Sequence, residues 1–312
     1  EESFVLLKNN GLLPLDRSKI RTIGVIGPNA NSRAALVGNY HGTASRYVTV
    51  LEGLQDYLGE DVRVLTGTGC ELFRDRTENL AFPADRLSEA KIVADNSDVV
   101  ILCVGLDETL EGEEGDTGNS YASGDKMDLQ LPQVQRDLME AVKETGKPVI
   151  LCLMAGSDID LSYASEHFDA VLQLWYPGAQ GGKAAAKVLF GEVSPSGKLP
   201  VTFYESLDEL PEFTDYRMAG RTYRYMKGKA QYPFGYGLTY GDVCVTEAVI
   251  AGCMETACGC GSKSSDGGFD SQALTILAGI CNAGTHATDE ILQVYVKNHD
   301  CADPDKHPEL CA

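Results

Sequence analysis

The chain has 312 residues, 46 of them acidic and 26 basic, which gives a formal net charge of −20. This balance argues against nucleic acid or an anionic membrane as a partner, because binding to either without sequence specificity requires basic patches. The sequence contains no run of 18 apolar residues, so we expect no membrane span. Its length leaves room for two domains.

The chain begins at Glu1 rather than at a methionine, and its first residues suggest the interior of a helix. Nothing there resembles a signal peptide, and we expect an excised or partial chain. Cys253, Cys258 and Cys260 cluster without a histidine at metal-ligand spacing. We therefore expect no metal site, reduced cysteines and a cytoplasmic location, and the role of this cluster stays open.

Short apolar runs alternate with helical stretches between residues 20 and 205. The sequence predicts strands at 21–27, 62–65, 99–105, 148–154 and 170–175, and helices at 85–96, 131–145 and 181–190. Strands that alternate with helices predict parallel β-α-β units. Runs that are apolar throughout predict a sheet covered on both faces. The predicted fold class is therefore α/β, with a mostly parallel sheet sandwiched by helices.

The sequence changes character after residue 241. Short β-like runs at 243–246 and 274–276 precede a stretch at 290–296 whose residues alternate as in a half-buried strand. A glycine- and serine-rich stretch at 259–268 predicts a flexible loop. We expect residues 1–240 to form the α/β domain and residues 241–312 to form a partial all-β module.

An acidic loop, residues 106–116, follows the apolar run 99–105. Its six carboxylates are Asp107, Glu108, Glu111, Glu113, Glu114 and Asp116. Open α/β folds keep their sites at the carboxyl ends of their strands, where this loop should lie. Carboxylates this close repel one another, so at least one should keep its proton to a raised pH, as a general acid must. A solvated surface loop or a cation site is the alternative.

Other motifs carry less information. Residues 24–29 lack the third glycine of the dinucleotide fingerprint, so we expect no nucleotide and no other cofactor. In the segment 38–42, Asn39 and Tyr40 could hydrogen-bond hydroxyl groups, although a plain turn fits equally well. His41 fits a polar loop residue better than a catalytic base. Trp175 and Tyr176 could line a sugar site or pack in the core.

Several segments, in order, resemble the carboxyl-terminal α/β sandwich domain of glycoside hydrolase family 3. The resemblance covers residues 1 to about 240 and includes 2–15, 23–30, 38–42, 194–203 and 232–240. The turn at 282–284 and the run at 294–296 resemble the start of the family's fibronectin-type-III-like module. Together these segments are specific to the family, although none would be sufficient alone.

The resemblance implies a retaining β-glycosidase that removes terminal β-linked sugars, a β-glucosidase first and a β-xylosidase second. In such enzymes one carboxylate attacks the sugar and another donates a proton to the leaving oxygen. The family's nucleophile is an Asp in a Ser-Asp-Trp-like context on a barrel domain, and this sequence has no Ser-Asp-Trp. We therefore expect the nucleophile in a missing amino-terminal barrel, which would be the partner of this chain.

The family's acid/base pattern, Glu-x-x-Asp-Arg, maps onto residues 113–116 and favours Glu113 as the acid/base, with Thr117 where many members have Arg. Glu111 is the runner-up and Glu114 is third. The other proposed substrate contacts are Asn39, Tyr40, Glu111, Glu114 and Asp116. A non-catalytic carbohydrate-binding or scaffold module that keeps only the fold is the alternative, and a barrel with an Asp nucleophile in the parent gene would decide between them.

Overall fold

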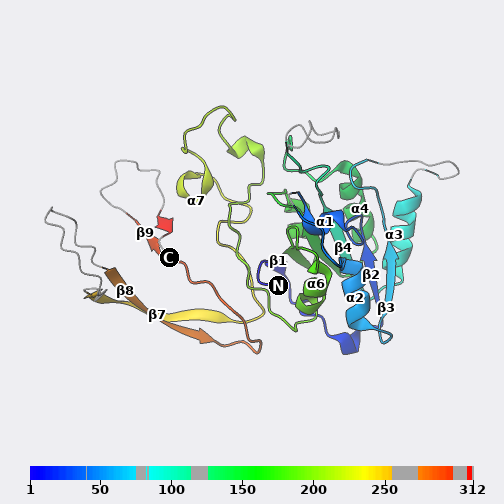
Figure 1. The fold of residues 1–312 in the computed structure, drawn as a ribbon, viewed down its shortest axis with the longest axis horizontal. Helices are drawn as coiled ribbons and strands as arrows, with labels where there is room; N and C mark the ends of the chain where they lie inside the picture. The colour runs from blue at the N-terminus through cyan, green and yellow to red at the C-terminus, as the bar shows by residue number, and fades with distance from the viewer. Residues whose placement is uncertain are drawn as a thin grey trace. The chain divides into compact units, whose positions relative to one another are not determined.

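In a computed structural model, the structure describes residues 1–39, 41–74, 82, 84–113, 126–254, 273–297 and 308–310. Its largest element is a six-stranded sheet with the order β1-β6-β5-β4-β2-β3 (Figure 1). The strands are β1 (Val5–Asn9), β2 (Thr22–Ile26), β3 (Arg63–Gly67), β4 (Val99–Gly105), β5 (Val149–Met154) and β6 (Ala170–Gln173). All neighbouring strands from β2 to β6 pair in parallel, and β1 pairs antiparallel with β6. The predicted α/β class and mostly parallel sheet are confirmed.

Helices cover both faces of this sheet. One layer contains α3 (Asp85–Asp95), α4 (Gln133–Lys143) and α5 (Ser162–His167), and the other contains α1 (Ala34–Val37), α2 (Val50–Leu58) and α6 (Gly181–Leu189) (Figure 1). The short elements η1 (Arg17–Lys19), η3 (Leu207–Glu209) and α7 (Thr222–Tyr225) lie in the connecting segments. Helix α2 begins with a capping box in which Thr49 and Glu52 satisfy each other's backbone amides.

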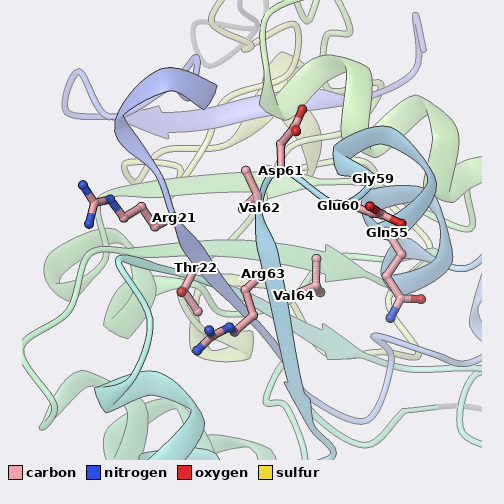
Figure 2. Close-up of a pocket in the computed structure, with 9 residues that line it drawn as sticks. All are labelled: Arg21, Thr22, Gln55, Gly59, Glu60, Asp61, Val62, Arg63 and Val64. Carbon is pink, nitrogen blue, oxygen red and sulfur yellow. The ribbon is translucent and has the colours of Figure 1, made fainter.

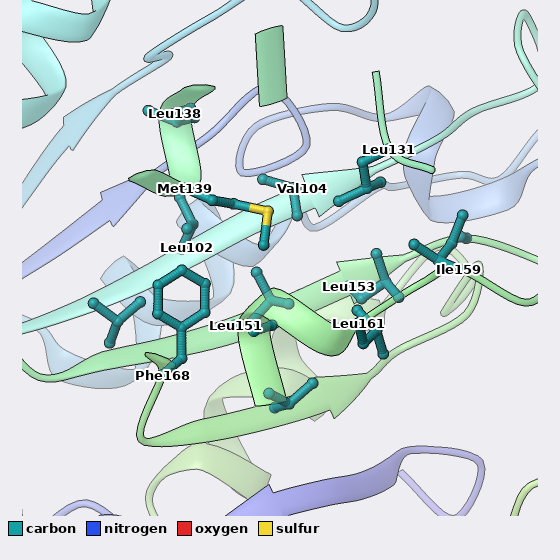
Figure 3. Close-up of a cluster of buried hydrophobic side chains, with 14 of the residues drawn as sticks. Leu102, Val104, Leu131, Leu138, Met139, Leu151, Leu153, Ile159, Leu161 and Phe168 are labelled. Atoms are coloured by element: carbon teal, nitrogen blue, oxygen red, sulfur yellow. The ribbon is translucent and has the colours of Figure 1, made fainter. Parts of the chain in front are cut away.

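The central strands are buried on both faces because alternate residues belong to two different cores. Strands β4 and β5 are buried at every position. One core takes Leu102, Val104, Leu151 and Leu153 together with the buried face of α4, as Figure 3 shows. The other core takes Ile101, Cys103, Ile150 and Cys152 together with α2 and α6. This two-sided burial explains why both strands are apolar throughout their length.

The start of the chain corrects one expectation. Residues 5–9 form the edge strand β1, not a helix, and Val5 lies opposite Gln173 while Leu6 lies opposite Leu172. A run of four apolar residues, Phe4 to Leu7, fits a buried helix or a buried strand equally well. The pairing with β6, far along the chain, selects the strand, and local sequence does not contain that information.

Two segments that carry the family resemblance pair with each other. The backbone amide of Leu199 donates to the carbonyl of Tyr236 at 2.8 Å, and that of Phe203 donates to the carbonyl of Tyr232 at 2.9 Å. The amide of Leu238 donates to the carbonyl of Leu6 at 2.8 Å, which joins these segments to β1. The segments 194–203 and 232–240 therefore cover the outer edge of the sheet, and their role here is structural.

The chain divides into two compact units. One unit is Glu1–Tyr240 together with Thr288–Ala312, and the other is Gly241–Ala287. The second unit contains the antiparallel hairpin of β7 (Val243–Met254) and β8 (Ala273–Asn282). The strand expected at 290–296 is reduced to β9 (Tyr295–Val296), which pairs with β10 (Glu309–Leu310).

Residues 259–268, expected to form a flexible loop, lie outside the described part of the chain. The fibronectin-type-III-like character of 241–312 stays a prediction. Among the described residues, none of the helices has the length and apolar character needed to cross a membrane.

Candidate active site

The acidic loop leaves the sheet at its topological switch point. Along the chain, β2 is followed by β3 on one side of it and then by β4 on its other side. Loops that leave two adjacent strands in opposite directions open a crevice at their carboxyl ends, and open α/β folds bind ligands there. The loop after β2 and the acidic loop after β4 therefore flank the expected position of a site.

A buried asparagine joins these two loops. The side-chain amide of Asn29, which follows β2, donates to the carbonyl of Leu106 at 3.0 Å, and Asn29 has no exposed surface. Asp107 comes next and is itself buried, with its Oδ1 accepting from the amide of Thr109 at 2.9 Å and from its hydroxyl at 2.6 Å. The first residues of the acidic loop are therefore held by the protein itself, and Asp107 serves as a turn-forming residue.

Glu111 points back into the protein. Its Oε2 accepts a hydrogen bond from the hydroxyl of Tyr176 at 2.6 Å and another from the backbone amide of Gly156 at 2.7 Å. Its Oε1 is buried and has no hydrogen-bond partner among the described residues. Tyr176 follows β6 and Gly156 follows β5, so a single carboxylate connects the loops after three neighbouring strands.

Tyr176 is the central side chain of this arrangement. Burial, together with the charge of the adjacent Glu111 carboxylate, raises the pKa of Tyr176 far above its usual value, so its hydroxyl stays protonated and can donate. Its ring packs against Gly38 and Gly156, where an added Cβ would stand 2.4 Å and 2.9 Å from ring carbons, respectively. Only glycine fits at such a close approach.

The segment 38–42 reaches the acidic loop as well. The Nε2 of His41 lies 3.3 Å from the Oε2 of Glu108, and its Nδ1 lies 3.0 Å from the carbonyl of Gly42. The Gly42 carbonyl, and to a smaller extent Glu108, raises the pKa of His41 above its usual value. Asn39 is half-buried in the same segment, and Tyr40 lies outside the described residues. His41 therefore contacts a carboxylate of the acidic loop.

Glu113 is the last described residue before the gap at 114–125, and its side chain is exposed. It therefore differs from Glu111, whose carboxylate faces inward. Glu114 and Asp116, the other predicted contacts in this loop, lie outside the described residues. The structure thus brings Glu111 and the segment 38–42 together around Tyr176, with Glu113 two residues further along the chain.

Sequence reasoning missed a half-buried pair, Lys126 and Asp158, beside Glu111. The Nζ of Lys126 donates to the backbone carbonyl of Asp158 at 2.5 Å, and Lys126 interacts electrostatically with Glu111. Burial lowers the pKa of Lys126 and raises the pKa of Asp158 to about 6. A clue was present in Ser157-Asp158-Ile159-Asp160, because polar residues directly after a buried strand lie at the edge of the sheet where sites form.

Trp175 has a structural role, and the role of the cysteine cluster stays open. The indole Nε1 of Trp175 donates to the carbonyl of Ser3 at 3.0 Å, and its ring packs edge-on against Phe203. Trp175 therefore packs against the core, which was one of its two expected roles, while Tyr176 reaches the site. Cys258 and Cys260 lie outside the described residues, and no group of three potential metal ligands occurs within the described ranges.

A hollow lies at the opposite edge of the sheet. This open depression has a volume of about 840 Å³ and lies at the amino ends of β2 and β3. Figure 2 shows the residues that line it. It mixes basic side chains, Arg21 and Arg63, with acidic ones, Glu60 and Asp61. It contains neither the acidic loop nor Tyr176, and parallel α/β sheets place their sites at the other edge. We therefore assign the site to the carboxyl edge.

Fold and site together define an α/β domain with an acidic loop at its switch point. The family model described as "Glycosyl hydrolase family 3 C-terminal domain" matches residues 4–240. The chain therefore belongs to glycosyl hydrolase family 3, and the expectation drawn from the sequence motifs is confirmed.

Relatives named as glycosidases match most of the chain. A beta-xylosidase from Formosa agariphila is 35% identical over 310 residues, which cover 96% of this chain and 39% of that protein. A xylan 1,4-beta-xylosidase from Xylanibacter ruminicola is 41% identical over 66% of this chain and 22% of its own length. A periplasmic beta-glucosidase from Salmonella typhimurium is 34% identical over 80% of this chain and 35% of its own length. This chain thus corresponds to well under half of each relative.

Solved structures agree with this assignment. A GH3 exo-beta-xylosidase, solved with a xylobiose aziridine activity-based probe, has a TM-score of 0.81 and 28% identity and covers 98% of this chain and 39% of its own. A beta-glucosidase from Erythrobacter marinus has a TM-score of 0.77 and 30% identity, over 98% of this chain and 41% of its own.

Proposed function

We propose that this chain forms the acid/base side of a retaining β-glycosidase site, with Glu113 as the proton donor and a nucleophilic Asp in a barrel domain outside these 312 residues. The observation that carries the proposal is the contrast within one loop. Glu111 is turned inward and accepts two hydrogen bonds, whereas the side chain of Glu113, two residues later, is exposed. A proton donor must reach the glycosidic oxygen, and an exposed carboxyl on a held loop can do so.

The need for a second domain follows from the chemistry. A retaining glycosidase requires two carboxyl groups about 5–5.5 Å apart, on either side of the scissile bond. The sequence lacks the family's Ser-Asp-Trp context, and the chain spans 22–39% of the lengths of the three relatives described above. Both facts support a nucleophile outside this chain, so we expect the chain alone to have no appreciable glycosidase activity.

The proposed substrates are terminal β-xylosides and β-glucosides. The motifs alone favoured β-glucosides, and two of the three relatives above are named as β-xylosidases. The two sugars differ by one hydroxymethyl group, and even a single methylene in a pocket changes discrimination by about 10–200-fold. A direct comparison of kcat/KM on both aryl glycosides can therefore rank them.

The test uses two proteins, the parent protein encoded by the complete gene and this 312-residue chain. We expect the parent to hydrolyse 4-nitrophenyl β-xyloside or β-glucoside with retention of configuration, and the chain to show no turnover above background. Turnover by the chain near that of the parent would contradict the proposal. A parent that binds xylo- or gluco-oligosaccharides without hydrolysing them would support the non-catalytic alternative.

A further inference from the structure

Two hydrogen bonds hold the carboxylate of Glu111 against the protein. Two donors from two different loops, the hydroxyl of Tyr176 and the amide of Gly156, converge on its Oε2 at 2.6 Å and 2.7 Å. Hydrogen bonds to a charged carboxylate are about twice as strong as those between neutral groups. The contact therefore joins the acidic loop to the carboxyl ends of β5 and β6.

The carboxylate of Glu111 is also closed to a sugar. Its Oε2 already accepts two hydrogen bonds, and its Oε1 is buried. The ring of Tyr176 lies beside it and is covered in turn by Gly38. A general acid must come within about 2.6–3.2 Å of the oxygen that it protonates, and neither oxygen of Glu111 is open to such an approach.

We propose that Glu111 is a positioning residue that fixes the direction in which the acidic loop carries Glu113 toward the substrate. The chain advances at most about 3.6 Å per residue, so an anchored Glu111 restricts the backbone of Glu113 to within roughly 7 Å of it. Misplacement of a catalytic group by about 1 Å can cost about 100-fold in rate. Anchoring two residues away is therefore enough to affect catalysis, and this consequence rests on the function proposed above.

The hydrogen bonds suggest a test that separates positioning from proton donation. In Glu111→Gln the side-chain carbonyl can still accept from Tyr176 and Gly156, whereas in Glu111→Ala both contacts are lost. In the parent enzyme we expect Glu111→Gln to keep kcat within about fivefold of wild type, and Glu111→Ala to lower kcat by about 30-fold or more with little change in KM. Tyr176→Phe, which removes one donor, should lie between them.

If Glu111 were the acid, Gln and Ala would be equally damaging, because neither can donate a carboxylic proton at neutral pH. Equal losses of kcat in Glu111→Gln and Glu111→Ala would therefore overturn the proposal. Tyr163→Phe is the control, since Tyr163 lies on α5 and packs against Phe168. It should leave kcat unchanged.

The anchoring itself can be measured on this 312-residue chain without any activity. Amide hydrogen exchange over residues 107–113 and at Gly156 should become faster by about fivefold to tenfold in Glu111→Ala and in Tyr176→Phe, and should change little in Glu111→Gln and Tyr163→Phe. Unchanged exchange in Glu111→Ala would overturn the anchor. If the parent is inactive while the variants of this chain show the expected exchange, the proposed function is refuted and, with it, the catalytic consequence of anchoring, whereas the anchor itself stands.

Discussion

Gly38 lies directly against the ring of Tyr176. A Cβ on Gly38 would stand 2.4 Å from Cδ2 of that ring, and the backbone of Gly38 has a φ of +60°. Both facts require glycine, because side chains rarely adopt that backbone conformation and the ring leaves no room for one. The loop after α1 is thereby connected to the side chain that holds Glu111.

Substitution of Gly38 should therefore disturb the site as well as the fold. We expect Gly38→Ala to lower the free energy of unfolding by about 1–3 kcal/mol and to accelerate amide exchange over residues 107–113 as Tyr176 shifts. Gly42→Ala is the matched control, because nothing lies within 4 Å of a Cβ on Gly42. Equal effects of the two substitutions would show that the contact with Tyr176 is unimportant.

Gln135 should be essential to the strand from which the acidic loop leaves. Its side chain is fully buried, donates to the carbonyls of Gly105 at 2.7 Å and Leu72 at 2.5 Å, and accepts from the amide of Gly105 at 2.8 Å. Gln135→Ala leaves these backbone groups without partners, which should cost about 2–4 kcal/mol of stability in denaturant titrations. The exposed Gln133→Ala should change stability by less than about 0.5 kcal/mol.

Asp158 should make the stability of the α/β domain depend on pH. Burial raises its pKa in the folded state to about 6, above the ordinary value of 3.8 for an aspartate, so the folded state binds more protons than the unfolded state between about pH 4 and pH 6. Stability therefore falls as pH rises through this window. The raised pKa of Asp158 corresponds to a change of at most about 3 kcal/mol in the free energy of unfolding. Asp158→Asn should remove this pH dependence of stability. Compared with the wild type, the variant should gain stability at pH 7 relative to pH 4.

Asp160 supplies the opposite control for that measurement. Burial raises the pKa of Asp160, but hydrogen bonds from Ser162, Gln130 and Gln231 outweigh burial and lower it overall. Asp160 therefore stabilises the folded state above the pKa that it has in the unfolded chain, and this stabilisation is lost as pH falls. Asp160→Asn should lower the free energy of unfolding at pH 7 and should lower it less in acid. Trp175, the single tryptophan of the chain, reports unfolding of this unit specifically. A slope between pH 4 and pH 6 that persists in Asp158→Asn would contradict the assignment.

Much of the fold could be predicted from local sequence. Strands such as Val99–Gly105 are apolar throughout because both of their faces are buried, and that property is visible without coordinates. The edge strand Val5–Asn9 was not predictable in the same way, since its conformation is set by pairing with residues 170–173. The stretch 290–296 alternates as a strand does, yet only Tyr295–Val296 finds a partner strand.

The site was predictable only in part. The density of carboxylates identified the acidic loop as a candidate site. Because this loop follows a buried strand, it could be placed at the carboxyl edge of the sheet. The distinction between an inward Glu111 and an exposed Glu113 depends on Tyr176 and Gly156, which are 65 and 45 residues away along the chain. No local pattern could have supplied it. The roles of Asn29 and Gln135 are equally tertiary, because both hold backbone groups of distant segments.

The most direct test of the account is azide rescue in the parent enzyme. Glu113→Gln should slow cleavage of substrates with poor leaving groups by about 10²–10⁴-fold, because general acid assistance is lost, and should spare substrates with good leaving groups in the first step. Hydrolysis of the glycosyl-enzyme should still be slow, since the same residue activates water. Azide needs no base, so it should restore turnover and yield a glycosyl azide.

Glu111→Gln should show neither the leaving-group dependence nor the azide product. If instead Glu111→Gln is rescued by azide and Glu113→Gln is not, the acid/base is Glu111, and both the proposed function of Glu113 and the positioning role of Glu111 are contradicted.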